Sequence, residues 1–233
     1  MGVGVTAGMV ARLEQDRPLL AQIGTADRVA ALLRDNIADG VFPPGTRLSE
    51  EAIGQALGVS RNTLREAFRL LCHERLAVHE LNRGIFVPVL TSEDVVDLYR
   101  LRRLVEGGAA RMAGAAPGAA RRAVVAAVTD AEQASAAGDW EAVRSEDLHF
   151  HQAVAALAGS PRVDELMRRA LAELRLVFHV MTDPERFHRP FVARNKVIAH
   201  LIDSKDGAAA EKELLAYLAD AERQLLAAYG AVQ

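Results

Sequence analysis

The chain has 233 residues, 50% of them hydrophobic, so it is long enough to bury the cores of two domains. Its formal net charge of −3 excludes a uniformly basic protein, and any contact with nucleic acid must come from a local cluster of positive charge. The single cysteine, Cys72, excludes an internal disulfide and a cysteine-based zinc site, which fits a reducing, cytoplasmic compartment.

Residues 1–24 are predicted to be an N-terminal arm, because their apolar runs are short and interrupted by charged residues. They lack the basic start and the uninterrupted apolar stretch of a signal peptide. No segment approaches the ~18–20 consecutive apolar residues that a membrane span needs. We therefore expect a soluble, cytoplasmic protein without a membrane partner.

Two short helices are predicted at the start of the region 25–88. Apolar residues recur at helical spacing over residues 26–39, and Gly40 ends this stretch. A proline-proline-glycine turn follows, and Ser49 then offers an N-cap oxygen for a second helix over residues 50–57, which begins with two glutamates. Local start and stop signals therefore mark both helices.

A third helix and a β-hairpin are predicted next. Gly58 ends the second helix, Ser60 can cap a third, and apolar side chains recur along that helix at positions i, i+3, i+4 and i+7. Residues 76–87 contain two β-prone runs around an Asn-Arg-Gly tripeptide, which is a hairpin signal. We therefore predict a winged helix-turn-helix over residues 25–88, made of three helices and a β-hairpin wing.

Polar residues at the N-terminal end of the third helix have the chemistry that suits DNA. The apolar stripe faces inward, which turns these residues outward, at the end that enters the major groove in a helix-turn-helix. Arginine can bond guanine and asparagine can bond adenine, while serine and threonine suit phosphates or bases. The residues predicted to contact DNA on this helix are Ser60, Arg61, Asn62, Thr63 and Arg65.

The positive charge of this region is local. Residues 25–88 carry eight arginines and eight acidic residues, whereas residues 61–83 carry five arginines against three glutamates, a net charge of +2. A single exposed arginine is more often solvated or paired with a nearby carboxylate. That alternative does not explain why capped helices, a glycine turn, outward polar residues and a wing arginine occur together.

Three motifs in this region, residues 42–50, 58–68 and 83–87, resemble the GntR superfamily of transcriptional regulators and occur in the expected order. An asparagine-threonine pair in the second motif replaces the commoner threonine-proline pair, so the family's base preference does not carry over. The resemblance implies further DNA contacts by Arg47, Arg83 and Gly84.

Residues 91–233 are predicted to form an all-helical, antiparallel bundle of six or seven helices. A long helical stretch opens at residues 91–94, and glycine- or proline-containing breaks follow it, among them Pro184 and Pro190. The region has no strand pattern, no nucleotide-binding glycine pattern and no solenoid repeat. The fold class is therefore mainly α, with a winged helix-turn-helix followed by a bundle.

Residues 99–106 and 147–151 resemble the helical ligand-binding (FCD) domain of the FadR-like branch of that superfamily. Independently of the family, Asp147 shares an apolar seam with residues at 4-3-4-3 spacing, so its carboxylate needs a metal, an arginine or a ligand as partner. Arg102 lies on an equivalent seam, where a guanidinium suits a carboxylate or phosphate effector. The alternative is that Arg102 pairs with Glu106 at i+4.

The FCD resemblance implies a divalent metal of the zinc or nickel type, held by an aspartate, a histidine four residues on and two further histidines. Asp147 and His151 match the first pair, but Asn195 and Tyr217 stand where the other two belong, and their oxygens are weak ligands. We favour a polar cavity closed by hydrogen bonds and water over an intact metal site. The remaining histidines, His188 among them, show no spacing that suggests ligation. The predicted effector-binding residues are Arg102, Asp147, His151, Asn195 and Tyr217.

Together these features predict a homodimeric transcriptional repressor, and not an enzyme. It is expected to bind a palindromic double-stranded operator, and its affinity to change when a small, carboxylate-bearing metabolite binds the helical domain. One alternative is a DNA-binding protein whose helical domain only dimerises. A second is a metal-dependent hydrolase built on Asp147 and His151, for which no nucleophile elbow, phosphate-binding glycine loop or complete ligand set is present.

Overall fold

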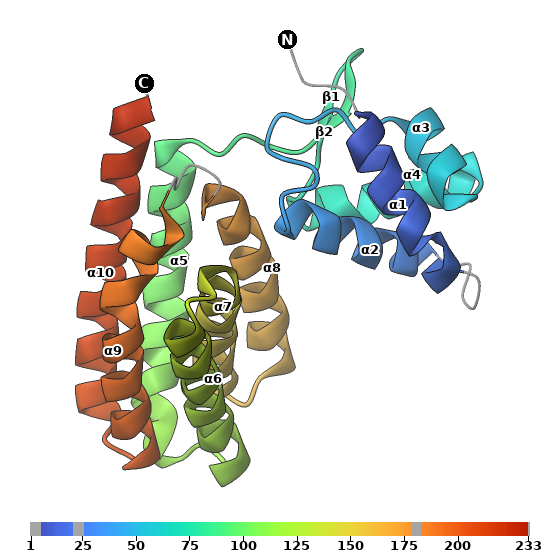
Figure 1. The fold of residues 1–233 in the computed structure, drawn as a ribbon. Helices are drawn as coiled ribbons and strands as arrows, with labels where there is room; N and C mark the ends of the chain where they lie inside the picture. Colours follow the sequence, from blue (N-terminus) through green and yellow to red (C-terminus); the bar gives the residue numbers. More distant parts are fainter. Residues whose placement is uncertain (1–5, 21–25, 179–182, 233) are drawn as a thin grey trace. The chain divides into compact units, whose positions relative to one another are not determined.

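The computed structural model describes residues 6–20, 26–178 and 183–232, and it divides into two compact units, Met1–Leu90 and Thr91–Gln233 (Figure 1). Each unit has buried hydrophobic side chains of its own. Among the helices of the described ranges, none is both long and apolar enough to cross a membrane.

The first unit is a winged helix-turn-helix, as predicted. Helix α2 (Ala26–Ala38) packs on α4 (Arg61–His73), and α3 (Glu50–Leu57) also contacts α4. Apolar side chains such as Leu33, Ile53 and Phe68 are fully buried between them. The elements of this unit are α1 (Ala7–Leu20), α2 (Ala26–Ala38), α3 (Glu50–Leu57), α4 (Arg61–His73), β1 (Val78–Glu80) and β2 (Gly84–Phe86).

The structure differs from the N-terminal arm expected over residues 1–24, because residues 7–20 of it form α1. This helix packs against α3, and its Leu13 is fully buried. The apolar residues of α1 do not recur at helical spacing, so its sequence carries little amphipathic signal. Contact with α3 stabilises this helix, since most helical stability in proteins comes from tertiary packing.

Capping residues define the turn between α3 and α4. The Ser49 hydroxyl accepts a hydrogen bond from the backbone N–H of Ala52 at 3.2 Å, and the Ser60 hydroxyl accepts one from Thr63 at 3.1 Å. Gly58 ends α3 with φ of 67°, a left-handed conformation that glycine adopts without steric cost. These caps end α3 and begin α4. The first turn of α4 lies at the surface.

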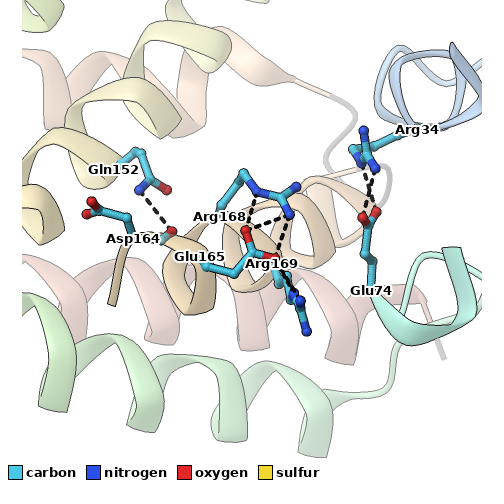
Figure 2. A network of polar contacts seen from close by, with 7 residues as sticks. All are labelled: Arg34, Glu74, Gln152, Asp164, Glu165, Arg168 and Arg169. Carbon is cyan, nitrogen blue, oxygen red and sulfur yellow. Dashed lines mark hydrogen bonds and ion pairs between the residues drawn. The ribbon is translucent and has the colours of Figure 1, made fainter. Parts of the chain in front are cut away.

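A bidentate ion pair joins α2 to the residue that follows α4. Arg34 Nε and Nη2 each donate to one carboxylate oxygen of Glu74 at 2.8 Å (Figure 2). Both side chains are largely buried, so this pair has a fixed geometry that exposed pairs lack. It therefore helps to hold the end of the recognition helix α4 on the core.

The wing is an antiparallel pair of β1 and β2, with Val78 opposite Phe86. Asn82 lies in the connecting turn with φ of 61°, a left-handed conformation that asparagine tolerates better than most residues. The segment before α3 runs along the other edge of β2, where the Leu48 N–H donates to the Ile85 carbonyl at 2.8 Å. The wing is thus anchored to the chain that leads into the helix-turn-helix.

The second unit is the predicted antiparallel, all-helical bundle, and Figure 1 shows its long helices side by side. Contacts between α5 and α10, between α6 and α7, and between α6 and α9 form most of its core. The elements described are α5 (Ser92–Arg111), the 3-10 turn η1 (Met112–Gly114), α6 (Gly118–Ala137), α7 (Trp140–Ala156), α8 (Pro161–Val177), α9 (Pro184–Asp203) and α10 (Gly207–Val232).

Polar contacts of α8 stabilise its start and its exposed face. Gln152 of α7 donates from Nε2 to the backbone carbonyl of Asp164 at 3.2 Å (Figure 2). The next residue, Glu165, accepts hydrogen bonds from both Arg168 and Arg169. These two pairs have the i, i+3 and i, i+4 spacing that supports a helix surface.

The predicted break at Pro190 is wrong, because α9 continues through this residue. A proline inside a helix removes one hydrogen bond of the ladder and crowds the carbonyl of the preceding turn. Phe187 and Phe191 on either side are buried, so packing offsets the missing bond. Pro184 does mark a boundary, since it begins α9, where an N–H has no partner within the helix.

A close backbone approach joins the start of α10 to the end of α5. A Cβ atom placed on Gly207 would lie 2.3 Å from the Arg111 carbonyl oxygen and 2.9 Å from its carbonyl carbon. Only glycine allows two backbones this near, because it has no Cβ. The contact fixes where α10 begins beside α5, and α10 supplies one of the residues of the polar cluster described below.

Candidate functional site

The first turn of α4 presents residues that were predicted to contact DNA. Arg61, Asn62 and Arg65 are exposed there. The Ser60 and Thr63 hydroxyl oxygens lie 2.8 Å apart, and Ser60 also accepts the capping hydrogen bond from the Thr63 N–H. Part of the hydrogen-bonding capacity of Ser60 is therefore used within the helix cap, which leaves the arginines and the asparagine as the side chains that extend furthest from it.

Ion pairs balance part of the positive charge counted from the sequence. Arg65 Nε lies 3.0 Å from Glu50 Oε1 on α3, and Arg83 in the wing pairs with Glu80. The arginines of both pairs are more than half exposed, so each pair adds little stability and can be exchanged for a phosphate. Within the described residues Arg61 has no carboxylate partner, so its charge is the least compensated of the three.

The Arg47 side chain lies against Gly84, the first residue of wing strand β2. Arg47 forms an isolated backbone bridge to Phe86 of β2, and its side chain is exposed. A Cβ on Gly84 would lie 3.1 Å from Arg47 Nε, and the φ of +115° at Gly84 is unfavourable for other residues. The glycine thus lets the wing strand pass beside the Arg47 side chain.

A buried polar cluster lies inside the second unit and connects helices that are far apart in sequence. Arg102 on α5 donates from Nε to Glu106 Oε1 at 2.8 Å, and the two side chains are 2% and 0% exposed. His151 Nδ1 on α7 donates to the other oxygen, Glu106 Oε2, at 2.6 Å. The i+4 pairing of Arg102 with Glu106 is therefore present, and Glu106 also binds His151.

Asp147 is the second carboxylate of this cluster. Its Oδ1 accepts hydrogen bonds from Asn195 Nδ2 on α9 at 2.8 Å and from the Tyr217 hydroxyl on α10 at 3.0 Å. The same hydroxyl lies 3.3 Å from His151 Nε2, and His188 Nδ1 lies 3.7 Å from Asp147 Oδ2. The five predicted effector-binding residues and Glu106 thus form one connected group.

The charges in this cluster compensate one another. Burial alone would raise the pKa of the Glu106 carboxyl, but Arg102 and His151 outweigh it and lower that pKa. Burial would likewise raise the pKa of Asp147, and His151, His188 and the Asn195 hydrogen bond lower it instead. Both carboxyls are therefore ionised at neutral pH, held by cations and donors from the surrounding helices.

Burial also shifts the pKa values of Tyr217, Tyr99 and His188 toward their neutral forms. Burial and the Asp147 charge raise the pKa of the Tyr217 hydroxyl well above its ordinary value, so it remains a donor. Burial raises the pKa of Tyr99 to about 12, and the Arg102 guanidinium carbon lies 4.8 Å from the centre of the Tyr99 ring. Burial lowers the pKa of His188 despite the neighbouring Asp147.

Sequence reasoning missed the place of His188 in the cluster. This side chain is 2% exposed and packs edge-on against Phe178 and Phe187. Its spacing from Asn195 is seven residues, two helical turns, which puts both on one face of α9. That spacing is the signal that could have identified it. His200, by contrast, is exposed.

Three buried polar atoms in the cluster have no hydrogen-bond partner among the described residues. They are Arg102 Nη2, His188 Nδ1 and Asn195 Oδ1. An unpaired buried polar atom costs about 1–3 kcal/mol, so a group of three needs an explanation. They offer a guanidinium donor, an imidazole nitrogen and an amide acceptor, which together suit a small ligand that carries both negative charge and a hydroxyl group.

The divalent metal that the FCD resemblance implies does not fit the residues present. Asn195 and Tyr217 hold the places of two imidazoles, and both point a donor hydrogen at Asp147 Oδ1. Among the described residues no group of three or more histidine, cysteine or acidic side chains is arranged to hold a metal ion. The donor set is that of a hydrogen-bonded polar site.

Comparison with known proteins gives the family of both units. Residues 25–87 match the family described as bacterial regulatory proteins, gntR family, and residues 97–220 match the FCD domain. A crystal structure of a putative GntR transcriptional regulator from a Rhodococcus species is 48% identical, with a TM-score of 0.80 over 88% of this chain and 98% of that one.

The curated relatives include operon repressors. The galactonate operon transcriptional repressor of Escherichia coli is 26% identical over 224 residues, 87% of this chain and 97% of its own length. The gluconate operon transcriptional repressor of Bacillus subtilis is 37% identical over 87 residues, which are 37% of this chain and 35% of the relative. With its winged helix-turn-helix and helical bundle, the chain belongs to the GntR family, in the FadR-like branch with an FCD domain, and is a DNA-binding transcriptional regulator and not an enzyme.

Proposed function

We propose that this regulator is a homodimeric repressor that binds a palindromic operator and releases it when a small hydroxylated organic acid occupies the buried cluster of the second unit. The observation that carries the proposal is the buried Arg102 Nη2, which has no hydrogen-bond partner in the part of the chain that the structure describes and lies within a cluster of compensated charges. A guanidinium donor in that setting suits a carboxylate ligand. The named functions of two relatives, repression of galactonate and gluconate operons, point to the same class of acid.

In the first unit, Ser60 caps the recognition helix α4. The residues proposed to contact the operator are Arg47, Arg61, Asn62, Thr63, Arg65, Arg83 and Gly84. Arg61 is the strongest candidate for a base contact, because it is exposed and lacks a carboxylate partner among the described residues. Two recognition helices related by twofold symmetry would read the two halves of a palindrome.

The test is a gel-shift titration of the promoter region next to the regulator's own gene, at several salt concentrations, with and without gluconate and galactonate. We expect sequence preference, a steep loss of affinity with salt, and weaker operator binding when the acid is added. Arg61→Ala should reduce affinity for the operator by about 10-fold or more, consistent with loss of ~1–3 kcal/mol at one base contact.

The exposed arginine Arg122 of α6 supplies a matched control, and Arg122→Ala should leave operator affinity unchanged. Absence of operator preference would overturn the DNA-binding assignment of these residues. If the operator is bound but no organic acid changes the affinity, the second unit is better explained as a dimerisation module. Sedimentation of the protein with the operator fragment would show whether two chains bind each palindrome.

A further inference from the structure

The hydrogen bonds to Asp147 replace the contacts that a cation would make with this carboxylate. Asp147 is 6% exposed, and its Oδ1 already accepts two bonds, from Asn195 and from Tyr217. A metal bound at this oxygen would have to displace both donors or meet their hydrogens. A buried carboxylate needs partners of this kind if no cation is present, and here α9 and α10 supply them.

Of the two imidazoles of the cluster, His151 is bonded to other side chains, whereas His188 Nδ1 has no hydrogen-bond partner among the described residues. His151 Nδ1 donates to Glu106, and its Nε2 lies 3.3 Å from the Tyr217 hydroxyl and 4.0 Å from Asp147 Oδ1. His188 presents Nδ1 to Asp147 Oδ2 at 3.7 Å. A zinc-like ion needs nitrogen and oxygen ligands at ~2.0–2.2 Å from one point, usually four of them. Neutral amide and phenol groups fill two of those four places.

We propose that the ligand site of this domain works without a metal ion: Asn195 and Tyr217 take over the neutralising contacts to Asp147, and the ligand binds directly to protein atoms. This inference rests on the proposed function in that it concerns the same site. The direct contacts are Arg102 Nη2 and His188 Nδ1 for the carboxylate of the ligand, and Asn195 Oδ1 for one of its hydroxyl groups.

The chemistry of the three atoms supports this division of roles. Arg102 donates from Nε to Glu106, and its Nη2 has no hydrogen-bond partner among the described residues. The Arg102 charge also helps to lower the pKa of Asp147. Asn195 uses its amide nitrogen on Asp147, which leaves Oδ1 as an acceptor that only a donor such as a hydroxyl can satisfy. A hydroxylated carboxylate carries both complementary groups, whereas an unsubstituted fatty acid carries one.

The first part of the test measures metal binding by the purified full-length protein. The metal content of protein prepared without chelator, and calorimetric titration with Ni²⁺ and Zn²⁺, should show no stoichiometric site in the wild type. The N195H/Y217H variant should bind Ni²⁺ at least about 100-fold more tightly than the wild type, because losing even an outer-shell partner of a metal site costs 10–100-fold. Stoichiometric metal in the wild type would overturn the proposal.

A second double variant controls for the loss of hydrogen bonds. N195A/Y217F removes both donors from Asp147 without adding an imidazole, so it should be less stable to heat than the wild type and should bind no Ni²⁺. Equal Ni²⁺ affinity in the two double variants would contradict the assignment of positions 195 and 217. If N195H/Y217H does not fold, which circular dichroism would show, the wild-type metal measurements and the chelator arm still decide the question.

The chelator arm uses gluconate as the probe. The shift in melting temperature that gluconate causes should be the same in buffer with and without EDTA, and a shift abolished by EDTA would overturn the metal-free site. Hexanoate, which has a carboxylate and no hydroxyl, should give a smaller shift than gluconate, and an equal shift would remove the role given to Asn195 Oδ1. If gluconate and galactonate both fail to shift the wild type, the proposed effector class is wrong, while the metal titrations still test the metal-free site separately.

Discussion

Glu106 holds two partners in the buried cluster, so Glu106→Gln should destabilise the second unit strongly. The carboxylate is 0% exposed and accepts from Arg102 at 2.8 Å and from His151 at 2.6 Å. A glutamine has nearly the same shape but only one acceptor oxygen, and its amide group turns a donor toward one of the two donors. Arg102 would then be a buried cation beside a neutral group.

The magnitude follows from the burial of both partners. Removing one member of a buried ion pair costs about 3–5 kcal/mol, because the other charge stays buried without compensation. We therefore expect Glu106→Gln to lower the free energy of unfolding of the second unit by about 3–5 kcal/mol. Arg102→Met should be costly for the same reason, but the R102M/E106Q double variant leaves no uncompensated charge. Its cost should fall below the sum of the single costs by about 2 kcal/mol.

The assay is urea unfolding followed by the fluorescence of Trp140. This residue is the single tryptophan of the chain and begins α7, so its signal reports on the second unit. Far-ultraviolet circular dichroism of the same samples checks that each variant is folded before urea is added. Additive effects of the two substitutions, or a cost below about 1 kcal/mol for Glu106→Gln, would refute the reasoning about charge compensation.

Three further outcomes are expected. Gly207→Ala should lower the free energy of unfolding by several kcal/mol, because its Cβ would lie 2.3 Å from a backbone oxygen. Gly108→Ala is the control: its Cβ would have nothing within 4 Å, so it should raise the free energy of unfolding by about 0.5–1 kcal/mol in the same urea assay. Equal effects would contradict the close approach. Gly84→Ala should reduce the free energy of operator binding, measured by gel shift, more than it reduces the free energy of unfolding. The new methyl group would lie 3.1 Å from Arg47 Nε in a strained backbone. Unchanged operator affinity would argue against a role for this contact. Burial raises the pKa of the Cys72 thiol, so its alkylation by iodoacetamide should reach half its maximal rate at a higher pH in the folded protein than in urea, and an identical pH profile would show that the thiol is fully solvated.

The helix-turn-helix is the part of this protein whose fold can be predicted from local sequence signals. Ser49, Gly58 and Ser60 act on backbone groups within three or four residues of themselves, so their effect does not depend on distant contacts. The alternating β-prone runs and the Asn-Arg-Gly turn are equally local. The α1 helix lacks such signals, and its stability comes from packing on α3, which is why it was expected to be an arm.

The buried cluster shows the opposite dependence. The sequence placed Asp147 and His151 on one face of α7, and Arg102 one turn before Glu106, because i, i+4 spacing is a property of a single helix. Neither pattern says which residues of α9 and α10 lie opposite. The FCD resemblance implied Asn195 and Tyr217, and His188 comes near Asp147 because α9 packs beside α7.

The sequence by itself determined the order of the elements from α2 to the wing, the mainly α fold, the exposed polar end of the recognition helix and the loss of two imidazoles from the family's metal-binding pattern. Tertiary structure alone decided how Glu106 is shared between Arg102 and His151, which donors satisfy Asp147 and which three polar atoms remain unpaired. The physical reason is the distance along the chain over which each interaction acts. Caps and helix periodicity act along the chain, whereas charge compensation in a buried site depends on side chains that approach through space from α5, α7, α9 and α10.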